Sequence, residues 1–389
     1  MEADDHDEHD STFGGSRASL ASSSTSLRSA VTRYQYEHGR RYHAYQAGIY
    51  LFPNDEQELN RMDIEHHNQR LQMNGNLHLC PVQDPTDILD LGTGTGIWCI
   101  DMAEKYPGAQ VIGTDLSPIQ PDWVPPNCRF EVDNFELDWT YGDNRFDLIH
   151  HRHLIGSISN HASLYKAAYN ALKPGGWIEV VEMEAKLYCD DGSVPETSAL
   201  KRWGEYIHEI FARSGRPFIP VQEYKTQLES AGFANVQYVE MKRPTNDWPK
   251  NPQLKEIGRV SIHAIIPTFV HLTDFKQYCA LNFLEGLEGF TVKPFIGVLG
   301  WSPPEVQVFL AQVRSESLKR SMHGYMKSCV CYAQKPLVPP QPSYSQAEAT
   351  SGDASTASIP APVSLAAGTD SAGPPFLDTP ATSTKSQDV

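Results

Sequence analysis

The chain has few cysteines, and none of its seven stands in a Cys-x-x-Cys pair. The closest two, Cys329 and Cys331, offer two ligands where a structural zinc site needs four. We therefore expect reduced thiols in an intracellular protein, and no metal site. No apolar run reaches the roughly 20 residues of a membrane span. The acidic, Ser-rich start also lacks the basic and apolar regions of a signal peptide.

Basic side chains are scarce too, with 32 Lys and Arg against 48 Asp and Glu and a net charge of −16. Affinity for nucleic acids comes largely from neutralising phosphates, so we expect no direct nucleic-acid binding, and no membrane association. Both ends of the chain contain few large apolar residues. Residues 1–32 are acidic and Ser-rich, and residues 336–389 are rich in Pro, Ser, Ala and Thr. These compositions predict two disordered tails around one large domain at 33–335.

Residues 86–98, TDILDLGTGTGIW, are the most informative stretch. The apolar run Ile88–Leu91 predicts a buried parallel strand. Gly92, Gly94 and Gly96 then allow the backbone to turn sharply and to pass close to a ligand, because no Cβ stands in the way. A helix that starts near Gly96 would point its unpaired N–H groups at the same ligand. This pattern indicates a nucleotide-type site on a doubly wound sheet.

The spacing of the glycines bears on which nucleotide binds. Dinucleotide folds usually show G-x-G-x-x-G and hold a pyrophosphate at the helix N-terminus. Here the spacing is G-x-G-x-G, and Asp90 precedes the first glycine by two residues. A carboxylate there suits a ligand with an amino group and a positive charge. The pattern resembles motif I of the class I S-adenosylmethionine (SAM) methyltransferases; a tight turn without a ligand is the alternative.

Four later segments occur in the order of the same fold. Val111–Thr114 reads as a strand that ends in Asp115, about 20 residues past the glycines, where a carboxylate meets ribose hydroxyls. Strands at 129–134 and 146–150 follow, and Lys173-Pro174-Gly175-Gly176 resembles the turn into strand five. The resemblance implies an α/β fold: a Rossmann-like, seven-stranded, mostly parallel sheet with helices on both faces and a helical substrate-side cover. It divides residues 33–335 into a lid (33–80), a cofactor-binding core (86–183), a helical cover (184–300) and a last helix and strand (301–335).

The same resemblance assigns site residues. Residues at the glycine loop would hold the amino-acid end of SAM, Asp115 the ribose and Asp133 the adenine; the full cofactor set is Asp90, Gly92, Thr93, Gly94, Gly96, Asp115, Leu116, Asp133, Asn134 and His150. Histidines at 150, 151 and 153 follow strand four, where the methyl group should face its acceptor. Because His150 continues the strand, His151 is the expected catalytic residue, either as a base or as a group that orients the acceptor. A pocket-lining or packing role is the alternative for all three.

The segment before motif I is crowded with Tyr, Arg and His between residues 34 and 50. As a lid it would cover the adenine or the sulfonium by stacking and cation–π contact. The alternative is an aromatic strap packed on the sheet edge.

The segments Gly39–Pro53, Leu89–Trp98 and above all Thr114–Pro121 (TDLSPIQP) resemble the fungal LaeA-like methyltransferases over roughly 36–335. This resemblance implies a nuclear regulator of secondary metabolism, transcription, development and sporulation that acts with velvet-type proteins. The alternative is a small-molecule SAM-dependent methyltransferase of metabolism, acting on an acid, a phenol or an amine. A catalytically dead SAM-binding scaffold is disfavoured because all three cofactor acids are present. The glycine spacing disfavours an NAD-dependent oxidoreductase.

Overall fold

The computed structural model describes residues 32–262 and 282–337. The predicted tails therefore lie outside the described residues, apart from their innermost positions. Within the described ranges, seven strands form one sheet in the order β5-β4-β3-β6-β7-β9-β8. Six of them run in the same direction, and β9 is antiparallel to both of its neighbours, β7 and β8. The strands are β3 (Asp87–Leu91), β4 (Gln110–Asp115), β5 (Cys128–Val132), β6 (Phe146–Arg152), β7 (Leu172–Met183), β8 (Ala234–Pro244) and β9 (Tyr325–Gln334).

The order of the strands indicates where a ligand-binding crevice lies, at the carboxyl ends of β3 and β6. From β3 the chain builds outward through β4 to β5, and it then returns to place β6 on the other side of β3. In open α/β sheets, ligands bind where the strand order reverses, outside the carboxyl ends of the strands. The seven-stranded, mostly parallel sheet predicted from the sequence is confirmed.

Helices cover both faces of the sheet. The helix α3 (Ile97–Lys105) packs on one face, where Ile88 of β3 meets Trp98 and Met102. On the other face, Leu89 belongs to a core cluster with residues of α4 (His161–Ala171) and α6 (Glu223–Ser230). Neighbouring residues of one strand thus enter different cores, because side chains alternate across a strand.

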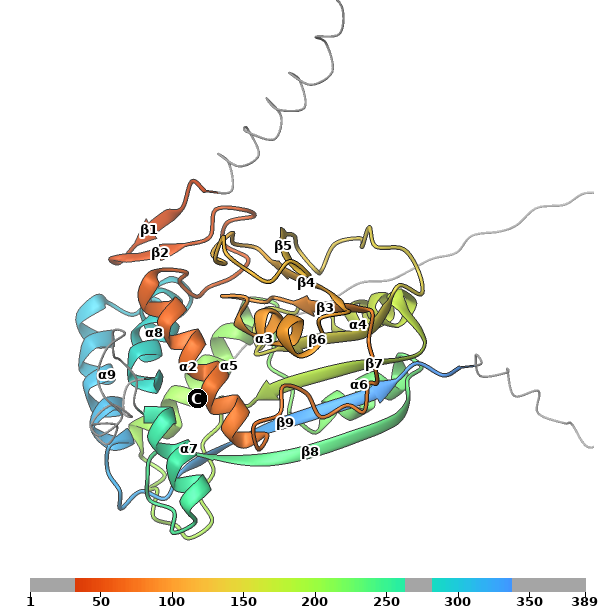
Figure 1. Ribbon diagram of the computed structural model, residues 1–389. Coiled ribbons are helices and arrows are strands. Elements are labelled where there is room, and N and C mark those ends of the chain that lie inside the picture. The colour runs from red at the N-terminus through yellow and green to blue at the C-terminus, as the bar shows by residue number, and fades with distance from the viewer. Residues whose placement is uncertain (1–31, 263–281, 338–389) are drawn as a thin grey trace, which may run out of the picture. The chain divides into compact units, whose positions relative to one another are not determined.

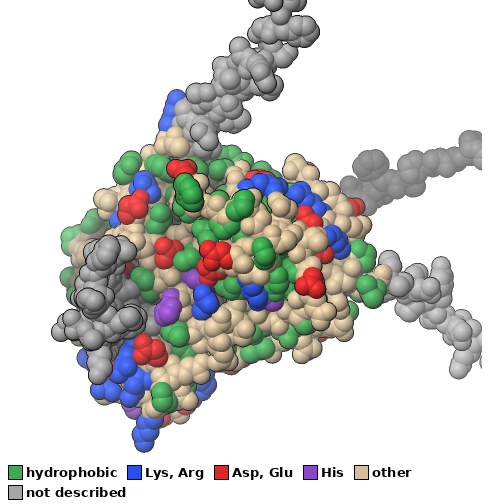
Figure 2. Space-filling model, viewed as in Figure 1, with side chains coloured by type: hydrophobic (Ala, Val, Ile, Leu, Met, Phe, Trp, Pro, Cys, Tyr) green, Lys and Arg blue, Asp and Glu red, His purple; other side chains and the backbone are tan. Residues whose placement is uncertain are grey.

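A second group of helices lies at the carboxyl ends of the parallel strands. Figure 1 shows α7 (Pro252–Ile262), α8 (Asn282–Leu299) and α9 (Pro303–Ser317) gathered beside α2 (Glu56–Gln72). An aromatic-rich core joins α8 and α9 to α5 (Ala199–Arg213). No helix in the described ranges is long and apolar enough to cross a membrane. On the face shown in Figure 2, acidic and basic side chains are interspersed among hydrophobic ones.

A short hairpin of β1 (Gln35–Glu37) and β2 (Arg40–Tyr42) precedes α2. Asp55 connects the two elements. Its Oδ2 lies 2.6 Å from Nε of Arg40, and its Oδ1 accepts the backbone N–H of Glu58 as the N-cap of α2. The cap satisfies a donor that the first helical turn leaves without a partner.

The Pro-Gly-Gly segment differs from its predicted form. The assigned strand β7 already begins at Leu172, which pairs with Phe146, and the regular register resumes only at Trp177 opposite Leu148. Residues 173–176 therefore form an irregularity within the pairing rather than a turn ahead of it. A Cβ at Gly176 would lie 3.0 Å from the carbonyl oxygen of Phe146, so the close backbone contact requires glycine there.

Candidate active site

The glycine loop turns directly after β3. Gly92 and Gly94 have φ values of 64° and 59°, a left-handed region that disfavours other residues. A Cβ on Gly92 would lie 2.3 Å from Leu154 Cδ2, and one on Gly94 would lie 2.9 Å from Met62 Sδ. The loop thus lies between α2 and the segment that follows β6. Glycine at these two positions leaves room for the side chains of both. Thr93 donates its backbone N–H to the carbonyl of Thr114, which ties the loop to β4.

Asp90 is buried one residue before the end of β3 and is held by a histidine. Nδ1 of His150 lies 2.7 Å from Asp90 Oδ1, and the indole of Trp98 stacks on the imidazole at 3.8 Å between ring centroids. Burial lowers the pKa of His150 to about 4, so the ring is neutral at pH 7. A neutral ring donates one N–H, and here the Nδ1–H is directed at the carboxylate.

Asp115 ends β4 with its carboxylate fixed by the backbone. Oδ2 accepts the N–H of Gly94 and Oδ1 accepts the N–H of Ser117, both at 2.9 Å. Burial raises the pKa of Asp115 to about 6. The carboxylate is thereby held at the rim of the glycine loop, with its orientation set before any ligand arrives.

The cleft brings together most of the predicted cofactor residues. Gly96 does not line it; this glycine begins α3 and packs against the ring of Phe130. Asp133 does not line it either, and its Oδ1 accepts the N–H of Asn134, whose amide in turn donates to Gln46 Oε1 at 2.6 Å. The remaining predicted residues line the cleft: Asp90, Gly92, Thr93, Gly94, Asp115, Leu116, Asn134 and His150.

His151, the expected catalytic residue, is not placed at the cleft. It is fully buried on the opposite side of β6, with Nε2 at 3.4 Å from the hydroxyl of Tyr165 and Nδ1 at 3.4 Å from Glu182 Oε1. Alternation along the strand explains this position: His150 and Arg152 face the cleft, so His151 faces α4. This position keeps His151 away from the cleft, so the prediction that it is the catalytic residue is not supported by the structure.

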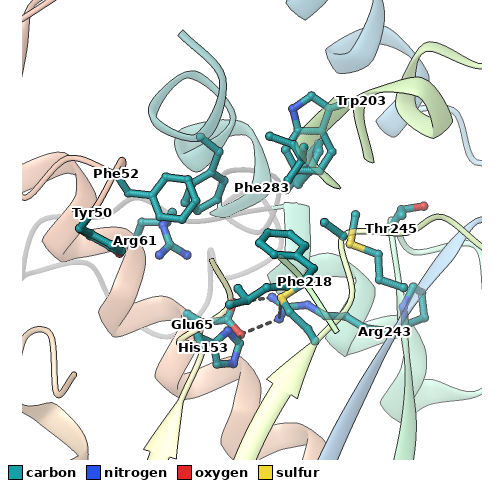
Figure 3. A pocket seen from close by; sticks show the side chains of 17 residues that line it. Tyr50, Phe52, Arg61, Glu65, His153, Trp203, Phe218, Arg243, Thr245 and Phe283 are labelled. Atoms are coloured by element: carbon teal, nitrogen blue, oxygen red, sulfur yellow. Dashed lines mark hydrogen bonds and ion pairs between the residues drawn. The ribbon is translucent and has the colours of Figure 1, made fainter. Parts of the chain in front are cut away.

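A second, mainly apolar cavity adjoins the cleft (Figure 3). Four residues line both spaces: Tyr50, Arg61, Glu65 and His153. The rest of the cavity wall is mostly aromatic and aliphatic, and comprises Phe52, Ile155, Met183, Ala185, Trp203, Ile207, Phe218, Pro244, Phe283, Phe290 and Met326, with Arg243 and Thr245 as polar members. Of the predicted lid tyrosines, Tyr50 lies at this junction, whereas Tyr36 is 74% exposed.

The charges at the junction are paired with one another. Both terminal nitrogens of the Arg243 guanidinium donate to the Glu65 carboxylate, and the distance from Nη1 to Oε1 is 2.6 Å. Although burial alone would raise it, the neighbouring Arg243 and His153 hold the pKa of Glu65 well below its usual range. Nε2 of His153 lies 3.6 Å from Glu65 Oε1, and burial lowers the pKa of His153 to about 3. Arg61 is held by Glu58 and lies over the ring of Phe290.

Sequence reasoning missed Arg61, Glu65 and Arg243 as site residues. The first two are four residues apart and so share one face of α2, which is a signal that periodicity does offer. Arg243 is 178 residues away from Glu65 in the chain, and nothing local in β8 indicates their contact.

One cluster outside the cleft has metal-type donors among the residues that the structure describes. Ligand atoms of His78, Cys80 and Glu179 lie within 4.8 Å of one another. Nδ1 of His78 already lies 2.9 Å from the Cys80 carbonyl, and Glu179 Oε2 accepts the backbone N–H groups of Leu79 and Cys80. These contacts hold residues 78–80 against β7, and none of them requires an ion.

The cleft fits SAM on the chemistry of its donors. The loop glycines leave a cradle that a Cβ would fill, Asp115 offers a carboxylate to ribose hydroxyls, and Asp90 offers one to an ammonium group. This sheet order, with this donor set at the carboxyl ends of β3 and β4, defines a class I SAM-dependent methyltransferase. SAM supplies an activated methyl group when bound, and the chain's residues hold it.

Comparisons with known proteins narrow the class to a family. A methyltransferase-domain family model matches residues 64–238. The chain is 41% identical to methyltransferase pytC of Aspergillus terreus, over 81% of this chain and 92% of the relative. It is 38% identical to the secondary metabolism regulator LAE1 of Cochliobolus heterostrophus, over 77% and 94%. For the protein-methionine methyltransferase laeA of Emericella nidulans the identity is 33%, over 78% and 77%. The chain belongs to the LaeA-like family of SAM-dependent methyltransferases.

A solved structure was also matched. The phosphoethanolamine N-methyltransferase 2 of Haemonchus contortus, in complex with SAM, aligns at 14% identity and a TM-score of 0.42, over 83% of this chain and 75% of that one.

Proposed function

We propose that the protein transfers the methyl group of SAM to an acceptor that occupies the apolar cavity. The observation that carries this proposal is the shared wall: Tyr50, Arg61, Glu65 and His153 line both the cofactor cleft and the cavity. An acceptor in the cavity would therefore lie directly beside the cofactor, with no bulk solvent between them. Because the sulfonium is already activated, positioning and the exclusion of water supply much of the catalysis.

The cavity wall indicates the kind of acceptor. Its lining is mostly aromatic and aliphatic, and its charged side chains Arg61, Glu65 and Arg243 are already paired inside the protein. This favours an apolar molecule, or an apolar side chain of a protein, over a highly charged one. With a pKa of about 3, His153 is neutral and a weak proton acceptor, so we assign it to orienting the acceptor.

A labelling experiment tests this proposal. The full chain is incubated with SAM carrying a radioactive methyl group and with fungal metabolite and protein extracts. Label should pass to an acceptor with wild type and should be lost with Ala185→Phe, which fills the cavity. The affinity for S-adenosylhomocysteine should be unchanged in that variant. Trp123→Ala, at a position that is 95% exposed, is the matched control. Equal labelling by Ala185→Phe would contradict acceptor binding in the cavity.

A second candidate function is regulation of secondary metabolism in the nucleus with velvet-type proteins. The support is the set of relatives named secondary metabolism regulators, at 32% to 38% identity. In a fungal strain that lacks this protein, wild type should restore the secondary-metabolite profile and Asp115→Ala should not. Tagged wild type should concentrate in nuclei and co-purify with velvet-type proteins. A cytosolic protein without such partners would contradict the regulatory role.

A further inference from the structure

Arg152 is a partly buried cation of the cleft, and within the described ranges it forms no ion pair with a carboxylate. It is the last residue of β6, and alternation places its side chain on the same face as His150, whose neighbour on β3 is Asp90. Arg152 lines the cofactor cleft. Among the described residues, no Asp or Glu oxygen forms a salt bridge with its guanidinium. In contrast, Arg61 at the same cleft and Arg243 in the adjoining cavity are held by carboxylates.

A relay of two residues fixes the Arg152 guanidinium instead. Its Nη1 lies 3.1 Å from Nδ1 of His66 on α2, and Nε2 of His66 lies 3.0 Å from Oδ2 of Asp101 on α3. The exposed Arg70 also contacts this Asp101 oxygen, with its Nη1 at a distance of 3.1 Å. Because the Nε2–H of His66 donates to Asp101, Nδ1 is left as an acceptor for Arg152. Burial lowers the pKa of His66, which keeps the ring neutral and able to accept.

An oriented guanidinium that lines the cleft and contacts no carboxylate in the described part of the chain is suited to bind an anionic group of a ligand. Burial lowers the pKa of Arg152, and the nearby charges of Asp90 and Glu65 offset this effect only in part. The amino-acid end of SAM carries one ammonium group and one carboxylate. Asp90 offers the negative charge in the cleft, and Arg152, two residues beyond the strand partner of Asp90, offers the positive one.

We propose that Arg152 binds the carboxylate of the amino-acid end of SAM, and that His66 and Asp101 are positioning residues that aim it. The guanidinium can present two parallel N–H groups to a carboxylate, a geometry that a lysine cannot offer. The cofactor's two opposite charges would then be recognised from one face of two adjacent strands.

Decarboxylated SAM isolates this contact, because it keeps the adenosine, the sulfonium and the ammonium group and lacks only the carboxylate. Calorimetric affinities of the full chain are measured for SAM, S-adenosylhomocysteine and decarboxylated SAM. Arg152→Gln should weaken the binding of the first two by about 10- to 100-fold, as expected for a lost charged hydrogen bond, and should leave the third unchanged. Arg152→Lys should be intermediate. Arg70→Gln, which removes the outer contact to Asp101, is the matched control and should bind all three ligands like wild type.

A separate measurement tests the positioning role of His66. His66→Gln should weaken SAM binding less than Arg152→Gln does, and should add nothing in the Arg152→Gln background. The unchanged affinity for decarboxylated SAM also shows that each variant is folded. Equal losses for SAM and decarboxylated SAM in Arg152→Gln would overturn the proposal. Unchanged SAM affinity with reduced methyl transfer would overturn it too, because Arg152 would then serve the acceptor. A wild type that binds none of the three ligands would contradict the cofactor assignment itself.

Discussion

Asp90 and His150, which are 60 residues apart in the chain, form a buried hydrogen bond of 2.7 Å between neighbouring parallel strands. The register of β3 and β6 pairs these two positions, so the contact exists only when both strands are correctly aligned. It joins the acid before the glycine loop to the strand that leads toward the apolar cavity.

Replacing His150 with Phe tests the value of this contact. The ring can still stack on Trp98, but the buried Asp90 oxygen loses its donor. We expect a loss of about 1–3 kcal/mol in the free energy of unfolding and weaker SAM binding. Urea denaturation and calorimetry measure the two effects, with the exposed His67→Phe on α2 as the control. Stability and affinity equal to wild type would show that Asp90 does not depend on His150.

Two glycine-to-alanine variants distinguish the effect of backbone strain from the effect of filling space in the cleft. Gly94 and Gly142 have φ values of 59° and 78°, but a Cβ would meet Met62 at Gly94 and nothing within 4 Å at Gly142. Alanine should cost about 1–2 kcal/mol of stability at either position. Only Gly94→Ala should also lose SAM affinity in a calorimetric titration. A comparable loss of affinity in Gly142→Ala would contradict the assignment of Gly94 to the cofactor cradle.

The affinity for SAM should depend on pH through Asp115. Its pKa of about 6 in the folded protein lies above the ordinary value of 3.8, because burial disfavours the charged form. Ribose hydroxyls donate to the ionised carboxylate, so binding should weaken as the pH falls through 6, by about tenfold between pH 7.5 and pH 5. His150 titrates lower, near pH 4.

Asp115→Asn is the control for this pH dependence. The variant should bind SAM more weakly than wild type at pH 7.5, and its affinity should be nearly constant over the same interval. A pH dependence that persists in Asp115→Asn would assign the titration to another group.

The Glu65–Arg243 pair supports the wall between the cleft and the cavity. Both side chains are buried, at 8% exposure each, so removing one partner leaves an uncompensated charge. We expect Arg243→Met to cost about 3–5 kcal/mol of stability and the double variant Glu65→Leu, Arg243→Met to cost less. Chemical denaturation of both single variants and the double variant measures this coupling. Purely additive losses would show that the two charges act independently.

The sequence predicts the parts of the site that lie close together in the chain. The glycine loop, Asp90 and Asp115 follow from strand ends and glycine spacing, and the order of the strands follows from their succession. The sequence does not predict which face of the sheet each histidine of β6 occupies. This strand is buried on both faces, so its apolar pattern does not show which residues point toward the cleft. The preference for His151 over His150 as the catalytic residue fails for that reason.

The apolar cavity also cannot be predicted from the sequence. It depends on how α2, α5 and α8 pack over β8 and β9, and residues such as Glu65 and Arg243 meet only in the folded chain. The relay from Asp101 through His66 to Arg152 likewise joins three separate elements. Local patterns carry no information about such contacts.

Calorimetric titration of the full chain with S-adenosylhomocysteine tests the central claim most directly. The account predicts one binding site in wild type, the same affinity in Ala185→Phe, whose change lies in the cavity, and no measurable binding in Asp115→Ala. Binding by Asp115→Ala with wild-type affinity, or no binding by well-folded wild type, would contradict the assignment of the cleft to the cofactor.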